Sequence, residues 1–381
     1  MAATKKSTTE LSTAELWKLY KGRVVADACK LYQKGKLKTA EDISNFLAPI
    51  TKELQDAIAI AIGLGAADHK DKVIDLILEG HSLAKSRTLF KDMTHSAISV
   101  AEVKSLIMAH QSEYEQWQQE SLQDRFYPVV YLDAIPISLK EGTTGSSQKN
   151  FIYTAIGLNM TGHKELISFL LDPALHDKSV PDFLKTLKQR GLTDPPFFCG
   201  SFDGSFDQSM VAEVFPNSNY IPNMKDFISY CVKQSPSDRA PLNKYLTAIY
   251  KAKTKRTVNY NIAHISALSF FRFNPPLSML ISYLEKRFIP EVADVLVTVP
   301  TALRKLLNEG TTFSENVEQM KTFIKGTGFT EAAQLNTILY LYSQRVLRKK
   351  MQRALSNWST LESELEECPF SKNMLPPQKL N

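Results

Sequence analysis

A carboxylate in the middle of an apolar segment is the first sign of chemistry in this chain. Asp133 follows the apolar run 129–132 and is itself followed by Ala134 and Ile135. A buried carboxylate is costly unless it is paired, protonated or bound to a metal ion. The position of Asp133 therefore marks a candidate site.

A second carboxylate, Asp203, closes the short apolar run FFCGSFDG. Carboxylates on rigid elements hold two divalent ions in many phosphoryl-transfer sites, with one ion activating the nucleophile and the other stabilising the leaving oxygen. Hard oxygen ligands of this kind favour Mg²⁺ or Mn²⁺. An aspartate at the end of a strand also commonly does no more than turn the chain, so spacing alone leaves both interpretations open.

The elements that would position these carboxylates follow from the apolar pattern. Runs at 128–139, 150–158 and 164–171 predict three consecutive strands. After them come a helix ended by Gly191, a short strand finishing at Asp203, a second helix and the strand SNYIP. Three sequential strands followed by alternating helices and strands predict an α/β sheet with mixed strand directions.

The residues before this sheet have the periodicity of helices. Apolar residues recur every three or four positions from Ser12 to about Leu89, and KVIDLILEGHSLAKSRTLF predicts a single helix. Ser99 can cap a further helix, with Glu102 in the capping-box position. A short helix, a tight turn and a capped helix are compatible with a helix-turn-helix and also with an ordinary helical hairpin.

Strand patterns disappear after the sheet, and prolines separate one helical segment from the next. This predicts an all-helical insertion followed by long C-terminal helices. The expected regions are an N-terminal helical region at 1–90, a helix-turn-helix and linker at 91–126, the first part of the sheet domain at 127–223, the insertion at 224–310, and C-terminal core helices and tail at 311–381.

Composition restricts the class of protein. The chain has 381 residues, of which 43% are hydrophobic, and a net charge of +6, which is compatible with a nucleic-acid partner. Its four cysteines are scattered without metal-site spacing, as expected of a reduced intracellular protein. Because no apolar signal core and no run of eighteen apolar residues occur, we expect a cytoplasmic protein that does not enter a membrane.

The sheet segment resembles a known family. YPVVYLDAIPI, followed by FIYTAIGLNMTGHKELISFLL, is similar to the catalytic core of mutator-type bacterial insertion-sequence transposases, which reads YPYLYLDG…VYVAIGVNEDGRREVLGF. SFDG at 201–204 resembles the family's SDG motif, TTFSENVEQMKTFI its glutamate-bearing segment, and LSNWSTLESEL its NWGLALNQL stretch. The resemblance covers roughly Ser99 to Glu367. It implies a ribonuclease-H-like fold with a helical insertion before the glutamate, preceded by an N-terminal DNA-binding region.

The resemblance also implies the site residues of a DDE-type transposase. Asp133, Asp203 and Glu315 would be the catalytic residues and the ligands of Mg²⁺ or Mn²⁺. Aligning the Thr-Thr pairs places Asn316 at the family's glutamate, so Glu315 requires a shift of one residue, and Glu318 is the alternative.

One motif of the family is missing. Pro222 and Lys225 stand where the family carries the cysteine and histidine of a Cys-x-x-His segment. Two functions therefore stay open: a DNA transposase that cuts and joins insertion-sequence ends, or a catalytically inactive, transposase-derived DNA-binding protein. A third hypothesis is another nuclease of the same fold acting on RNA–DNA or branched substrates.

Basic clusters fit a DNA partner, although such clusters are also ordinary solvated helix faces. Lysine and arginine side chains neutralise phosphates in a salt-dependent and sequence-independent manner. The resemblance implies transposon ends and target DNA as partners, a homodimer on DNA because two ends must be brought together, and a nucleoid-associated location. The predicted DNA contacts are Lys104, Lys251, Lys253, Lys255, Arg256, Arg345, Arg348, Lys349 and Lys350.

Overall fold

The structure is a computed structural model, and the chain divides into two compact units. The first unit comprises Met1–Lys72 and Thr88–Ala97, and the second comprises Val73–Arg87 and Ile98–Asn381. The structure describes residues 13–61, 70–94, 96–141, 146–172, 179–200, 206–223, 233, 239–267, 278, 281–372 and 374–375.

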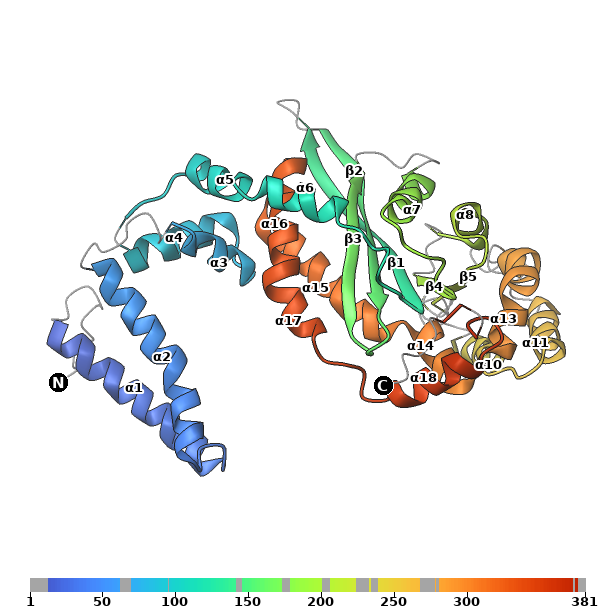
Figure 1. The fold of residues 1–381 in the computed structure, drawn as a ribbon, viewed down its shortest axis with the longest axis horizontal. Coiled ribbons are helices and arrows are strands. Elements are labelled where there is room, and N and C mark those ends of the chain that lie inside the picture. The colour runs from blue at the N-terminus through green and yellow to red at the C-terminus, as the bar shows by residue number, and fades with distance from the viewer. Residues whose placement is uncertain are drawn as a thin grey trace. The chain divides into compact units, whose positions relative to one another are not determined.

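The first unit is built on two long helices, α1 (Thr13–Gln33) and α2 (Ala40–Ala61) (Figure 1). The start of α2 is fixed by a reciprocal cap. The Asp42 carboxylate accepts the backbone amide of Thr39 at 2.8 Å, and the Thr39 hydroxyl accepts the amide of Asp42 at 3.1 Å. Backbone amides, first that of Lys38, lower the pKa of Asp42.

The helix predicted over KVIDLILEGHSLAKSRTLF is two helices, α3 (Lys72–Leu78) and α4 (Leu83–Thr94), so this prediction was wrong. Gly80 has a φ of +97° and donates its amide to the Ile77 carbonyl at 2.9 Å, which ends α3. The Ser82 hydroxyl then accepts a backbone amide of α4 at 3.3 Å. The local glycine and serine chemistry therefore overrode the continuous apolar periodicity.

The capped helix predicted at Ser99 is confirmed as α5 (Val100–Met108). The Ser99 hydroxyl accepts the Glu102 amide at 3.1 Å, and the Glu102 carboxylate accepts the Ser99 amide at 2.9 Å. Helix α6 (Gln111–Gln119) follows. The buried face of α5 packs on a C-terminal helix, α16 (Ala332–Tyr342).

The sheet has five strands in the order β3-β2-β1-β4-β5. Strands β1, β2 and β3 are antiparallel neighbours, whereas β4 is parallel to β1 and β5 is parallel to β4. The predicted order and mixed directions are thus confirmed. The strands are β1 (Val129–Glu141), β2 (Ser146–Leu158), β3 (Lys164–Asp172), β4 (Phe197–Gly200) and β5 (Asn219–Pro222).

Helices cover both faces of the sheet (Figure 1). On one face, α7 (Ser179–Gln189) and α8 (Gln208–Val214) close an apolar core with the inward side chains of β1 and β2. On the other face lie α15 (Thr311–Thr327), α16, the π-helix η5 (Ser343–Leu347) and α17 (Arg348–Met351). The last helix is α18 (Trp358–Glu367).

An aromatic cluster joins α6, β3 and α16 on this second face. Phe169 of β3 lies 5.5 Å from Tyr114 and 5.4 Å from Trp117, measured between ring centroids. Tyr340 of α16 lies 5.6 Å from Trp117. Residues more than 220 positions apart in the sequence therefore share one packed cluster.

Every element of the insertion that the structure describes is a helix. Its elements are α10 (Arg239–Tyr250), α11 (Lys255–Ala267), the π-helix η4 (Leu284–Val292), α13 (Ala293–Thr298) and α14 (Thr301–Glu309). Among the described residues, no helix has the length and apolar character needed to cross a membrane.

Candidate active site

Asp133 lies where the parallel strands end. Leu132 of β1 pairs with Gly200, the last residue of β4, and Gly200 pairs with Pro222, the last residue of β5. Asp133 is the next residue of β1 and is only 5% exposed. It pairs with Thr154 of β2, whose hydroxyl donates to the Asp133 carbonyl at 3.4 Å.

The face of the sheet on which Asp133 lies is defined by its neighbour two positions earlier. Side chains alternate along a strand, so Tyr131 and Asp133 share one face. The Tyr131 ring stacks on Phe313 of α15 with centroids 5.2 Å apart and planes 7° apart. Its hydroxyl lies 3.3 Å from the Ser314 hydroxyl. Asp133 is therefore on the face that α15 covers.

The opposite side of the same strand segment is purely apolar. Leu132 and Ala134 pack in the core with Phe183 and Leu184 of α7. The alternation of β1 thus separates an apolar layer from a layer that contains a carboxylate, which explains how a charged residue is tolerated inside the run.

Two glycines allow close packing around this edge. A Cβ added to Gly200 would lie 2.5 Å from the Leu132 carbonyl oxygen and 2.9 Å from the Tyr220 hydroxyl. Gly310, with a φ of +56°, joins α14 to α15, and its Cβ would lie 2.6 Å from the Asn223 amide nitrogen. The start of α15 is therefore pressed against the ends of β1 and β5.

Buried amides gather near this edge, and sequence analysis missed them. Asn223 follows β5 directly and is fully buried. Asn308 of α14 is fully buried, and within the described part of the chain neither of its side-chain polar atoms has a hydrogen-bond partner. No sequence pattern signals such residues, because asparagine near a helix end is common in loops and caps.

The third predicted carboxylate lies on α15. Glu315 and Glu318 are both exposed, whereas Asn316 between them is 4% exposed. Glu318 pairs with Lys321 at 3.0 Å. Burial lowers the pKa of Lys164, the first residue of β3, and the nearby negative charge of Glu315 partly offsets that effect.

Of the three metal ligands predicted from the sequence, the described residues include Asp133 and Glu315. Asp203 and Lys225 lie outside the described residues, which resume after β4 at Phe206. Among the described residues, no three His, Cys, Asp or Glu side chains come close enough to hold a metal ion. Asp133 and Glu315 offer the carboxylate oxygens that Mg²⁺ and Mn²⁺ prefer.

Four of the predicted DNA contacts are paired with other side chains of the described residues. Lys104 pairs with Glu331, Lys255 pairs with Asp294 at 2.6 Å, and Arg345 lies 3.4 Å from Asp75. Lys350 donates to the side-chain oxygen of Gln319 at 3.1 Å. The other predicted contacts are exposed: Lys251, Lys253, Arg256, Arg348 and Lys349.

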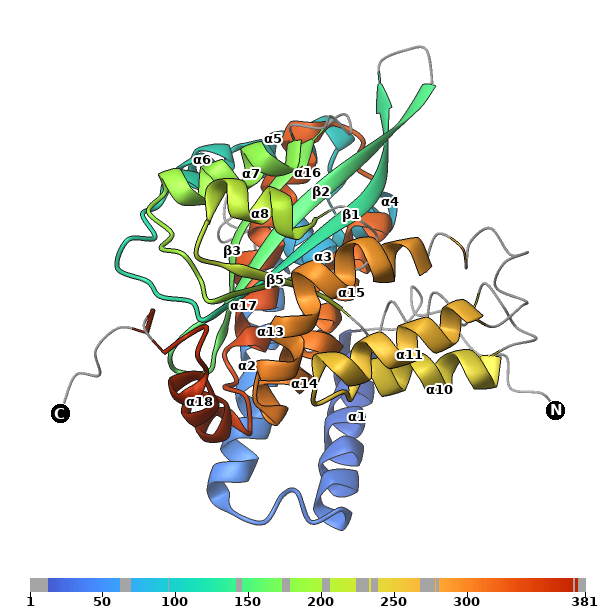
Figure 2. The ribbon, with the colours of Figure 1, turned by 90° about the vertical axis from the view of Figure 1, so that its right-hand side faces the viewer.

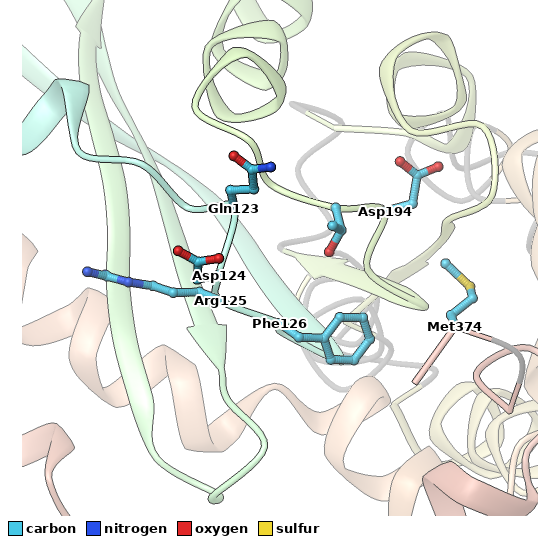
Figure 3. Close-up of a pocket in the computed structure, with 7 residues that line it drawn as sticks. Gln123, Asp124, Arg125, Phe126, Asp194 and Met374 are labelled. Carbon is cyan, nitrogen blue, oxygen red and sulfur yellow. The ribbon is translucent and has the colours of Figure 1, made fainter. Parts of the chain in front are cut away.

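A surface pocket of about 440 Å³ lies at the opposite end of the parallel strands. It is lined by residues that precede β1 and β4, including Phe126 and Asp194, and by Met374 (Figure 3). The Arg125 guanidinium points away from Met374 in this view. The pocket precedes the starts of β1 and β4, whereas Asp133 lies beside the end of β4, so this pocket is separate from the candidate site.

The family model of transposases of the Mutator family matches residues 65–272, which is more than half of the 381 residues. The chain belongs to this family. It is 24% identical over 188 residues to the transposase for insertion sequence element IS1201 of Lactobacillus helveticus, covering 49% of each chain.

Two further relatives carry similar names. A protein of Corynebacterium diphtheriae named "Probable transposase for insertion sequence element" is 26% identical over 282 residues, covering 72% of this chain and 76% of that one. The transposase for insertion sequence element IS256 in transposon Tn4001 of Staphylococcus aureus is 25% identical over 120 residues, 32% of this chain and 30% of its own. The chain spans about half the length of the first relative and about three quarters of the second.

Proposed function

We propose that the protein is a DDE-type DNA transposase that cuts and joins insertion-sequence ends by two-metal phosphoryl transfer. The observation that carries the proposal is the buried carboxylate of Asp133 at the carboxyl ends of the parallel strands, on the face that α15 covers, in a chain of the Mutator family. Three antiparallel strands followed by two strands parallel to the first support a ribonuclease-H-like core.

The proposed metal ligands are Asp133, Asp203 and Glu315, with Mg²⁺ or Mn²⁺ as the ions. Bound divalent ions of this kind activate water, and then a 3′-hydroxyl, and neutralise the charge on the leaving oxygen. The chain's own contribution is positioning. The ladder with Thr154 fixes Asp133, and the Tyr131–Phe313 stack fixes the start of α15 against β1.

Glu315 is the preferred third carboxylate for an electrostatic reason. Glu318 already has a cationic partner, Lys321, on its own helix. The negative charge of Glu315 instead partly offsets the lowering of the Lys164 pKa by burial. Asn316 is a neutral amide and cannot supply the negative charge that divalent ions require.

DNA binding is part of the same proposal. The N-terminal helices would recognise transposon ends, with Lys104 of α5 among the contacts. Lys251, Lys253, Lys255 and Arg256 of the insertion and Arg345, Arg348, Lys349 and Lys350 of the last helices would neutralise backbone phosphates. A homodimer would hold two ends together, and the complex would be nucleoid-associated.

The test is strand cleavage of DNA that carries the element's end sequence, with purified full-length protein and Mg²⁺. Asp133→Asn should lower the cleavage rate at least about 100-fold, because even outer-shell partners of metal sites are worth 10–100-fold. DNA affinity of this variant should be retained. Asp124→Asn, which alters an exposed carboxylate at the opposite end of β1, should cleave normally.

The same assay assigns the other two ligands. Asp203→Asn and Glu315→Gln should be as defective as Asp133→Asn, whereas Glu318→Gln should keep most of the activity. Unchanged cleavage by Asp133→Asn would refute the site, and a defect in Glu318→Gln alone would move the third ligand to Glu318.

A second function is favoured by one departure from the family pattern. Pro222, at the position where the resemblance expects a cysteine, closes β5 beside Gly200, at the same edge as Asp133. A proline in place of the family's cysteine at this edge is expected of a transposase-derived DNA-binding protein that has lost catalytic activity. DNA binding by the wild-type protein without any Mg²⁺- or Mn²⁺-dependent cleavage would favour this alternative.

A further inference from the structure

The net positive charge of the chain is concentrated in one pair of helices. Residues 239–267, which form α10, α11 and their connection, contain six lysines or arginines and no aspartate or glutamate. The whole chain has a net charge of +6, so all other residues together are neutral. The six basic residues are Arg239, Lys244, Lys251, Lys253, Lys255 and Arg256.

The two helices pack side by side (Figure 2). Buried apolar side chains recur at helical spacing on each helix. They are Leu242, Leu246 and Ile249 of α10, and Val258, Ile262 and Ile265 of α11. Each helix therefore has a buried apolar face, and α11 packs on η4 and α13 as well as on α10.

A second stripe of α11 faces solvent. Arg256, Tyr260 and His264 are spaced four residues apart, so they lie on one face of the helix, and all three are exposed. Tyr260 is 66% exposed, which is unusual for a large aromatic side chain. This stripe places a guanidinium one turn away from an aromatic ring.

The exposed Tyr260 and His264 rings are stacked, and the half-buried Tyr245 ring lies tilted against His264. The Tyr260 ring lies 5.8 Å from the His264 ring with planes 20° apart, and His264 lies 5.0 Å from Tyr245 of α10. The Lys244 ammonium lies 5.9 Å from the centre of the Tyr245 ring. Because each ring is supported by the next, Tyr260 is held in place on the surface before any ligand arrives, which reduces the entropy lost on binding.

An aromatic ring beside cationic side chains matches the chemistry of an unpaired nucleotide. Base faces stack on aromatic side chains without regard to sequence, while lysine and arginine neutralise the adjoining phosphates. Within a duplex the faces of each base are covered by neighbouring bases, so a surface ring can stack only on a base that has left the stack.

We propose that the α10–α11 hairpin binds an unpaired DNA base, which stacks on Tyr260 while Arg256 and Lys253 neutralise the flanking phosphates. The site is distinct from the carboxylates of the sheet. The inference rests on the proposed function, since it specifies which feature of the DNA the insertion recognises: an unpaired base at an end, nick or flap.

The test compares two DNAs of equal length, a fully paired duplex and the same duplex with 2-aminopurine in a short unpaired flap. Full-length protein is titrated in EDTA, so that no strand is cut. Tyr260→Ala should weaken flap binding roughly 5- to 150-fold, the range for loss of one stacked base. Its affinity for the paired duplex should not change, and Tyr260→Phe, which keeps the ring, should behave as wild type.

Further variants distinguish an effect of base stacking on affinity from an effect of charge and from a loss of folding. Asn259→Ala alters the exposed neighbour of Tyr260 on α11 and should leave the flap-to-duplex affinity ratio unchanged. Arg256→Gln should lower the salt slope of binding by about one, whereas Tyr260→Ala should leave that slope unchanged. The melting temperature of Tyr260→Ala should equal that of the wild type.

The outcomes distinguish the inference from the function on which it rests. Wild-type protein that binds the duplex and the flap with equal affinity, or a Tyr260→Ala variant with the wild-type ratio, would overturn the stacking site alone. Absence of binding to both DNAs would overturn the proposed function as well. Quenching of 2-aminopurine by the wild type that is lost in Tyr260→Ala would support the site directly.

Discussion

Single residues at the carboxyl ends of the parallel strands decide how closely β1, β4 and β5 can approach. Gly200→Ala should destabilise the protein by about 1–3 kcal/mol, the usual cost of overpacking. The added methyl group would meet the Leu132 carbonyl oxygen at 2.5 Å, and backbone cannot move aside as a flexible side chain can. The measurement is the free energy of unfolding in urea.

Gly22→Ala is the matched control, because it makes the same chemical change where space is open. Gly22 lies within α1, and an added Cβ would have no heavy atom within 4 Å. Replacing a glycine inside a helix by alanine stabilises it by about 0.5–1 kcal/mol. Equal effects of the two substitutions would show that the close approach at Gly200 does not matter for stability.

At this scale the sequence indicated some residues of the candidate site and gave no sign of others. Asp133 was identifiable because a charge inside an apolar strand is visible in the residue order. The choice among Glu315, Asn316 and Glu318 was not, since Glu315 and Glu318 share one face of α15 and only packing fixes the rotation of that helix. Asn308 gave no signal, because its burial depends on packing between α14 and the ends of β4 and β5.

Among the elements, helix α14 is capped at its N-terminus by a side chain of α18. The Glu364 carboxylate of α18 accepts the backbone amides of Ala302 at 3.1 Å and Leu303 at 2.6 Å. Glu364→Ala should cost about 1–2 kcal/mol, since it removes a cap and a favourable charge at a helix N-terminus. Thermal unfolding followed by circular dichroism measures the loss.

Glu367→Ala supplies the comparison on the same helix. Glu367 is exposed at the C-terminal end of α18, where a negative charge is unfavourable, so its removal should be neutral or slightly stabilising. A Glu364→Ala variant as stable as Glu367→Ala would contradict the capping role.

Element order was more predictable than element ends. The three strands of the meander, the helix and strand alternation after them and the capped helix at Ser99 all follow from local periodicity and capping chemistry. The break at Gly80 was missed because apolar spacing continues across it, and only the positive φ of Gly80 reveals the turn. The helical insertion was recognisable from the absence of strand patterns, but its π-helix η4 was not.

For the molecule as a whole, the placement of charge predicts how DNA affinity depends on salt. Replacing Lys251, Lys253 and Arg256 together by glutamine should lower the slope of log affinity against log salt by about two to three, because each duplex phosphate contact contributes about 0.9. Binding to unrelated duplexes should weaken to a similar extent. Fluorescence anisotropy at several NaCl concentrations measures both effects.

Replacing Lys85, Lys286 and Lys372 instead removes the same formal charge from exposed positions outside the hairpin. This control should leave the slope nearly unchanged. Equal reductions by the two triple variants would mean that DNA responds to total charge and not to the hairpin, and the insertion would lose its assigned part in binding.

The aromatic cluster of Trp117, Phe169 and Tyr340 can be completed only late in translation. A ribosome that has just translated Phe169 must add about 170 more residues before Tyr340 exists to cover it, which takes roughly 10 to 30 s at bacterial and eukaryotic elongation rates. During that interval the face of the nascent sheet that carries Phe169 lacks its cover from α16. A prematurely terminated product that ends within the insertion would keep that face open, and would be a substrate for chaperones and proteases.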